Sequence, residues 1–271
     1  MDFIENLGLI YQGILAGIFI ALSCSMVGVY LLMRRLSMLG AGISHSAFGG
    51  IALSFLFGVE PTIFTLIYTA LVSFFIQFMM ERKNLPSDTI LSLFFSFGTA
   101  LAVIILSLSG SLGQEIYSYL FGSILTVSEM ELYLSFAIFI LSLLVFKLKY
   151  DDLFLVLFNE EIARLRGINT SFLNYMFVLL AGINIVLSIK VAGLLLSASF
   201  VALPSMTALL IANSFFQTFL LSAMFAFLSV IFGIFVSLIY NIPPSGSIVM
   251  IMVLLFLLSF AIYTVKTRKG L

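Results

Sequence analysis

Uncharged apolar segments about 20 residues long recur along the whole chain, and they constrain its fold more than any other feature. A helix needs about 20 such residues to cross the hydrocarbon core of a bilayer. Only 9% of the 271 residues are charged, whereas a soluble domain has about 25% charged residues. Because a soluble chain could not hide so much apolar surface, we predict an all-α, polytopic membrane protein with one transmembrane domain over residues 1–271.

Eight or nine transmembrane helices are compatible with these segments, and we prefer nine. The weakest boundary lies at Lys190, where a single charge divides a long apolar run, and the segment 132–146 is short for a span. The candidate spans are 7–32, 38–57, 62–80, 89–110, 132–146, 172–189, 191–212, 215–239 and 247–265.

The positions of the basic residues predict the orientation. With nine spans, 11 of the 12 Lys and Arg residues fall on one side of the membrane. Cytoplasmic loops are enriched in these residues, so we expect the N-terminus outside and the C-terminus inside. The 12 acidic residues balance the 12 basic ones, so the sequence offers no positively charged surface for nucleic acid.

Two segments between spans are long enough to form structure of their own. On the cytoplasmic side, Asn159 should cap a short helix that starts with Glu160 and Glu161 and ends near Gly167. This helix, within the cytoplasmic segment 150–170, is either a solvated linker or a docking element for a soluble partner. Outside, residues 113–131 are too polar to span and should form a short interfacial or re-entrant helix with Tyr117 and Tyr119 near the interface.

His45 is the only ionisable side chain clearly inside a predicted span, among small residues that favour close helix packing. Such a group is a candidate functional residue, and two interpretations remain open: a neutral imidazole that holds helices together, or a metal ligand or gate. Pro204 permits a kink in its span, which suits either a pathway-lining helix or simple packing.

No catalytic motif is present in the sequence. The HExxH, GxSxG and phosphate-binding Gly-Lys-Ser/Thr patterns are all missing. We therefore expect no catalytic site in this chain, and if it takes part in ATP-driven transport, another subunit hydrolyses the nucleotide. The alternative is a stand-alone secondary carrier of metal or other cations, which should have several coupled carboxylates near the membrane midplane.

Several segments, in the expected order, are similar to the membrane permease subunits of the ABC importers for zinc, manganese and iron. The first of these segments contains Arg34 and Arg35 and is followed by Ser-His-Ser at 44–46. The external segment contains Leu-Phe-Gly-Ser-Ile-Leu at 120–125. The matching segments are 33–40 with 43–46, 119–127, 160–167, 191–196 with 203–208, and 242–249.

The resemblance implies a homodimer in a prokaryotic cytoplasmic membrane that imports a divalent metal, zinc or manganese, with no permanently bound cofactor. It also implies a dimer of cytoplasmic ABC ATPases and an extracytoplasmic metal-binding protein as partners. We expect His45 to contact the metal. Ser44, Ser46 and Pro204 are candidates for the translocation path. The candidate ATPase-coupling residues are Glu160, Glu161, Ala163, Arg164 and Gly167.

Two positions depart from the pattern of this family. Members commonly have an Asp four residues before the histidine, on the same helix face, where this chain has Ala41. The acidic residue of the last turn is replaced by Asn241. The carboxylate partner of His45 is therefore missing, and Ser44, Ser46 or His45 of a second copy could take its place.

Overall fold

The computed structural model describes residues 3–82, 86–108 and 118–268, and these segments are helical with no strand among them. This confirms the predicted all-α class. The elements are α1 (Phe3–Met33), α2 (Leu39–Phe57), α3 (Pro61–Arg82), α4 (Ser87–Leu108), η1 (Ile124–Thr126), α6 (Glu129–Phe158), α7 (Glu160–Leu165), α8 (Thr170–Ala192), α9 (Leu194–Ile211), α10 (Phe215–Tyr240) and α11 (Pro244–Arg268).

Within the described residues, nine helices are long and apolar enough to cross a membrane, which confirms the preferred number. The uncertain division near Lys190 is real: α8 ends at Ala192, α9 begins at Leu194, and Gly193 between them has a φ of 77°. Glycine adopts this left-handed region without a steric penalty, so it separates the two helices within a single residue.

The short span at 132–146 belongs to a 30-residue helix, α6, which continues through the charged residues Lys147, Lys149, Asp151 and Asp152. Residues 147–158, which lie beyond the end of the candidate span, are therefore helical. Charges end the stretch of chain that lipid can solvate, but they do not end the hydrogen-bonded helix, because a helix end can extend into water. The helix stops at Asn159, whose φ and ψ are extended.

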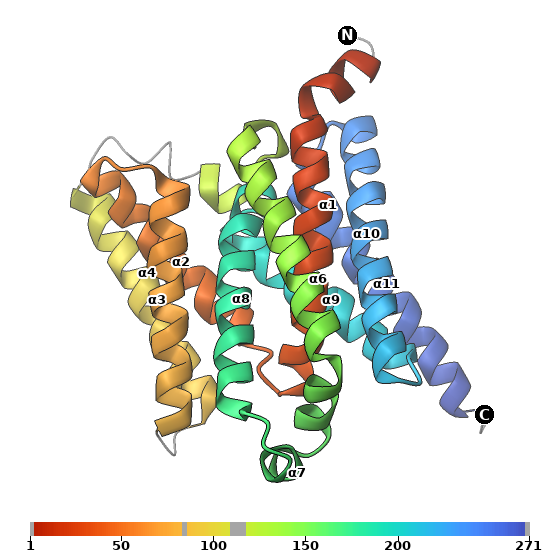
Figure 1. Cartoon of the computed structure of the whole chain (residues 1–271). Coiled ribbons are helices and arrows are strands. Elements are labelled where there is room, and N and C mark those ends of the chain that lie inside the picture. The colour runs from red at the N-terminus through yellow and green to blue at the C-terminus, as the bar shows by residue number, and fades with distance from the viewer. Residues whose placement is uncertain (1–2, 83–85, 109–117, 269–271) are drawn as a thin grey trace.

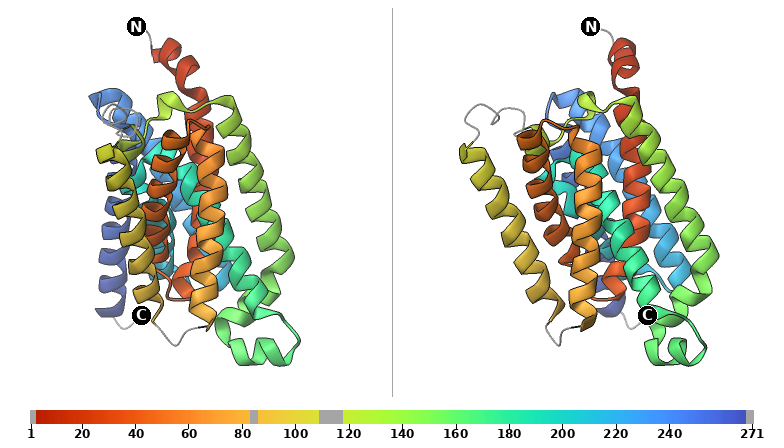
Figure 2. Two further views of the ribbon diagram at one scale, coloured as in Figure 1. Left: turned by 90° about the vertical axis from the view of Figure 1, so that its left-hand side faces the viewer. Right: turned by 60° about the vertical axis from the view of Figure 1, so that its left-hand side comes forward.

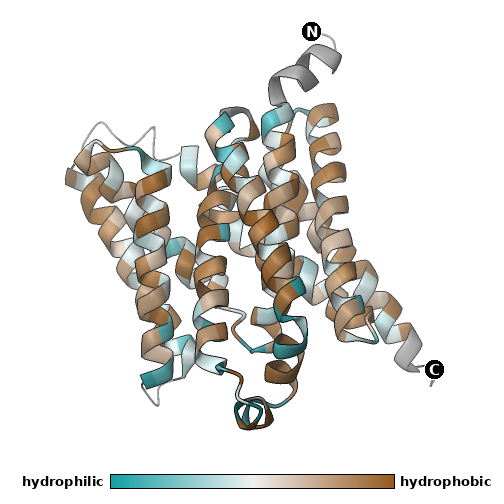
Figure 3. Cartoon of the chain, viewed as in Figure 1, coloured by the Kyte–Doolittle hydropathy of each residue, from teal (hydrophilic) through white to brown (hydrophobic). Residues whose placement is uncertain are grey.

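The helices form two groups around α8 (Figure 1). Helices α2, α3 and α4 pack on one side of α8, and α1, α6, α9, α10 and α11 lie on the other. The spans of α1, α2 and α8 are the most buried, whereas α4, α6 and α11 leave most of their surface open. Brown, hydrophobic colour covers the outer helices along most of their length (Figure 3), which is the surface expected of a chain that a bilayer surrounds.

The segments predicted on each side of the membrane gather at opposite ends of the bundle. Helix α7, the α1–α2 connection and the C-terminal end of α11 lie at one end, and the N-terminal end of α1 lies at the other (Figures 1 and 2). The segment 118–128 lies at the N-terminal end too.

The described part of the external segment is hydrogen-bonded to two of the membrane-spanning helices. The Ser123 N–H donates to the Lys190 carbonyl at 2.9 Å, and the Ser245 hydroxyl donates to the Phe121 carbonyl at 2.8 Å. Residues 118–121 are helical and are followed by η1. Tyr117 lies outside the described residues, so its predicted interfacial position has no structural counterpart. The two hydrogen bonds, at Ser123 and at Phe121, tie the described part of the segment to α8 and α11.

Candidate functional site

His45 lies on α2 and faces α4. Its Nδ1 is 3.2 Å from the Thr99 hydroxyl, and its ring stacks at a tilt on Phe95 with 3.9 Å between centroids. Helix α4 can approach α2 so closely because Gly98 has no side chain. A Cβ at this position would collide with the His45 carbonyl. With Nδ1 engaged, Nε2 is the ring nitrogen left for another partner.

The two serines beside His45 point to different helices. The Ser44 hydroxyl donates to the Gly40 carbonyl at 2.7 Å and lies 2.8 Å from the Ser197 hydroxyl of α9. The Ser46 hydroxyl donates to the Phe94 carbonyl of α4 at 2.9 Å. Both side chains are buried, so in this conformation they connect α2 to its neighbours.

Pro204 is buried inside α9, where it leaves a carbonyl of the preceding turn without its helical partner. Ser205 follows it and donates from its hydroxyl to the Ser25 carbonyl at 3.1 Å, beside the Ser222 hydroxyl at 3.2 Å. The proline therefore lies next to a buried polar junction of α1, α9 and α10. His45 and Pro204 are on different helices, and no contact between them is observed.

Among the described residues, no carboxylate lies beside His45. Ala41 occupies the preceding turn of α2, on the same face. Asn241 ends α10 in the left-handed conformation, with a φ of 51°, which asparagine tolerates better than most residues. Among the residues that the structure describes, no group of three or more His, Cys, Asp or Glu side chains could hold a metal ion.

Helix α7 forms as the sequence predicts. The Asn159 side chain accepts hydrogen bonds from the N–H groups of Glu161 and Ile162 at 3.0 and 3.1 Å. After the last turn, Gly167 has a φ of 81°, and its N–H donates to the Arg164 carbonyl. Both ends of this six-residue helix are thus fixed by residues that the sequence supplies locally.

Glu160 connects α7 to the membrane-spanning helices. Its carboxylate binds Arg34 at the end of α1 at 2.8 Å and Arg164 of α7 at 2.7 Å. Burial raises the pKa of the Glu160 carboxyl, but the hydrogen bonds and charges of the two arginines outweigh burial, so its pKa lies below the ordinary 4.5. Ala163 is fully buried on the inner side of α7, whereas Leu165 is 88% exposed.

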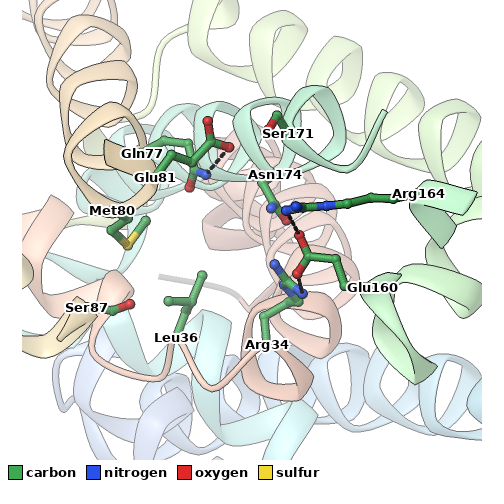
Figure 4. A pocket seen from close by; sticks show the side chains of 10 residues that line it. All are labelled: Arg34, Leu36, Gln77, Met80, Glu81, Ser87, Glu160, Arg164, Ser171 and Asn174. Carbon is green, nitrogen blue, oxygen red and sulfur yellow. Dashed lines mark hydrogen bonds and ion pairs between the residues drawn. The ribbon is translucent and has the colours of Figure 1, made fainter. Parts of the chain in front are cut away.

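A polar cavity of ≈ 420 Å³ opens beside this ion pair, at the end of the bundle that contains α7 (Figure 4). It lies among α1, α3, α4, α7 and α8, and it contains both signs of charge. The side chains that line it are Arg34, Leu36, Gln77, Met80, Glu81, Ser87, Glu160, Arg164, Ser171 and Asn174.

A second ion pair, at the opposite end, was missed by the sequence analysis. Lys190 of α8 binds Glu131 of α6 at 3.2 Å, and its Nζ lies 4.9 Å from the centre of the Tyr119 ring. Glu131 is 5% exposed and also accepts from the Thr62 hydroxyl at 2.8 Å. The sequence predicts that Lys190 and Glu131 lie on the same side of the membrane. No motif or spacing in it indicates that the two side chains contact each other, because they belong to different helices.

Taken together, the fold and the site define a polytopic helical membrane protein, with many spans, a single histidine within a span, and a capped helix exposed at one end. The family described as the ABC 3 transport family matches residues 6–263, and the chain belongs to this family. It is thus a multi-pass membrane protein of the ABC transporter class.

Relatives of known description are similar over nearly their whole length. The high-affinity zinc uptake system membrane protein ZnuB of Buchnera aphidicola is 32% identical over 93% of this chain and 97% of that protein. The manganese import system permease protein ScaB of Streptococcus gordonii is 29% identical over 96% of this chain and 95% of that protein. A solved structure of PsaBC from Streptococcus pneumoniae in complex with Fab is similar to 95% of this chain and 94% of the matched chain, with a TM-score of 0.83 and 26% identity.

Proposed function

We propose that this chain is the permease subunit of an ATP-driven importer for a divalent transition metal, zinc or manganese. The observation that carries the proposal is the full-length family match, which runs through both His45 and α7. Relatives described as zinc uptake and manganese import permeases support this cargo. No catalytic site is proposed for the chain itself, and the metal is cargo, not a resident cofactor.

In the proposed complex, two copies of the chain form the translocation path. A single protomer supplies one imidazole and no neighbouring carboxylate among its described residues, and one nitrogen is a poor site for zinc, which takes four ligands. A twofold axis would bring His45 of each copy to equivalent positions. Ser44, Ser46 and Pro204 are proposed to lie along this path.

Helix α7 is proposed to dock the cytoplasmic ABC ATPase. It projects from one end of the bundle (Figure 1), presents exposed Ile162 and Leu165, and is attached to α1 through Glu160. An ATPase that moves α7 would therefore also displace the end of α1. In this proposal α7 lies in the cytoplasm, the N-terminus lies outside, and the chain is in the cytoplasmic membrane of a prokaryote. An extracytoplasmic metal-binding protein would deliver the cargo.

Metal uptake into vesicles that contain the full complex tests this proposal. We expect ATP-dependent uptake of zinc or manganese, lost in His45→Ala but kept in Ser54→Ala, a buried serine of the same helix outside the proposed site. The ATPase should purify with the wild-type chain and be lost from folded Glu161→Ala and Gly167→Ala variants. Unchanged uptake in His45→Ala would remove this residue from the mechanism. ATP-independent uptake driven by an ion gradient would favour a secondary carrier.

A further inference from the structure

Helix α3 buries its polar face and exposes its apolar face. Five polar residues, Thr62, Thr65, Thr69, Ser73 and Gln77, recur every three or four positions, and each is at most 4% exposed. Ile67 and Leu71, on the outer face, are 61% and 57% exposed. Residues at this spacing share one side of a helix, so the polar groups form a continuous row against the rest of the protein.

The partner of this row is α8. A Cβ at Gly182 would collide with the Ser73 hydroxyl and would lie 3.5 Å from the Thr69 methyl group. Nearer the Lys190 end, Val186 and Ile189 of α8 line a small cavity together with Thr62 and Thr65. We call this interface, formed by the row on α3 and by residues 182–189 of α8, the α3–α8 seam.

The middle of the seam lacks hydrogen-bond partners in the protein. Among the described residues, five side chains have a buried polar atom without a partner, and four of them belong to α3: Thr65, Tyr68, Thr69 and Ser73. Only the two ends of the row are paired, Thr62 with Glu131 and Gln77 with Glu81.

Other hydroxyls in this bundle show what a helix normally does with such groups. Those of Ser44, Thr99, Thr207 and Ser229 each donate to the carbonyl one turn back, at 2.7 to 2.8 Å. The hydroxyls in the middle of the α3–α8 seam do not. A buried polar group without a partner is costly. Tyr68 turns its ring toward Gly50 of α2, but the other three hydroxyls, of Thr65, Thr69 and Ser73, share one face of α3 and indicate a common ligand.

The chemistry of the seam favours water over a metal ion as this ligand. Hydroxyls both donate and accept, and the middle of the row carries no charge to balance a metal ion. The cavity beside Thr65 measures ≈ 10 Å³, about the size that holds one water molecule. At the other end, Gln77 lines the polar cavity of ≈ 420 Å³, from which water can enter.

We propose that the α3–α8 seam binds a row of internal water molecules, held by Thr65, Thr69 and Ser73 and supplied from the cavity that Gln77 lines. Water-mediated bonds exchange partners readily. The seam is therefore an interface along which α8, the helix directly after α7, can shift against α3 without losing direct hydrogen bonds. The proposal does not depend on the cargo, so its failure would leave the proposed function untouched.

The sign of a stability change tests the proposal in the full chain. Valine has nearly the shape of threonine but no hydroxyl. If water occupies the seam, Thr65→Val/Thr69→Val strands that water and should lower the thermal midpoint more than Thr207→Val/Thr218→Val, a double control in which each hydroxyl bonds its own helix. If the seam is dry, the seam variant removes unpaired polar groups and should raise the midpoint. A midpoint equal to or above that of Thr207→Val/Thr218→Val overturns the proposal.

A measurement on the unsubstituted chain covers the case in which the variants fail to fold. X-ray radiolysis converts ordered internal water into hydroxyl radicals that label adjacent side chains. We expect label on Ile189, which is 1% exposed and lines the small cavity together with Thr65. Ile185, one turn earlier on the same helix and fully buried, is the control and should remain unlabelled. Equal labelling of Ile189 and Ile185 overturns the proposal.

Discussion

Glu160 joins two cations from distant parts of the sequence, Arg34 at the end of α1 and Arg164 one turn along α7. The i,i+4 pair within α7 could be inferred from the sequence alone. The pair with Arg34 could not, because it depends on how α7 folds back against the bundle. At the scale of single residues, this contact is what turns an independent short helix into one that is attached to a membrane span.

Replacing Glu160 by glutamine should destabilise the folded chain by about 1 kcal/mol, since half-exposed ion pairs contribute little individually. Glu161→Gln is the control, because its carboxylate has no ion pair among the described residues. The pKa of Glu160 lies below the ordinary 4.5, so its stabilising effect is present above about pH 4.5 and is lost as pH falls through its own lower pKa. Thermal midpoints measured against pH should converge for wild type and Glu160→Gln in acid. A constant difference would contradict this.

At the scale of elements, local signals in the sequence located most helices. Apolar runs marked the nine spans, and Asn159 and Gly167 marked the ends of α7. The errors occurred where charge was taken as a helix end, as in α6 after Lys147. The break between α8 and α9 has two causes. Gly193 adopts the positive φ that ends α8, and its missing side chain lets the backbone of segment 118–128 pack against it.

Gly193 should therefore be much less replaceable than Gly58, another glycine with a positive φ. A Cβ at Gly193 would collide with the backbone of Leu120 and Phe121, whereas one at Gly58, with a φ of 64°, would meet open space. We expect Gly58→Ala to cost about 1–2 kcal/mol from backbone strain alone. Gly193→Ala adds the collision and should cost more than about 4 kcal/mol. Denaturant titrations in detergent compare the two. Equal costs would show that the backbone of segment 118–128 gives way easily.

At the scale of the whole molecule, the positions of the charges predict sidedness, and the fold gathers the corresponding segments at opposite ends (Figure 2). Helix α7 and the α1–α2 connection share one end, although more than 100 residues separate them in sequence. The distribution of Lys and Arg predicts that this bundle is oriented with α7 toward the cytoplasm.

Cysteine labelling tests this orientation, because Cys24 is the chain's single cysteine and is fully buried. In a Cys24→Ala background, Val59→Cys lies between α2 and α3, and Leu165→Cys lies on α7; both positions are exposed. In right-side-out vesicles, an impermeant maleimide should label the first variant directly and the second only after permeabilisation. The reverse pattern would place α7 outside and would refute cytoplasmic docking.

The sequence by itself determined the all-α class and the capped α7 and favoured nine spans over eight, because these depend on apolar length and on side chains within one turn of each other. It also marked His45 as the only ionisable side chain clearly inside a predicted span. Only the tertiary structure decided which distant groups meet: Arg34 with Glu160, Lys190 with Glu131, and the polar face of α3 with Gly182 of α8. The spacing of that face was present in the sequence, but its significance depends on burial. Hydrophobicity and capping act locally along the chain, whereas hydrogen bonds and charges acquire their partners only when the helices pack.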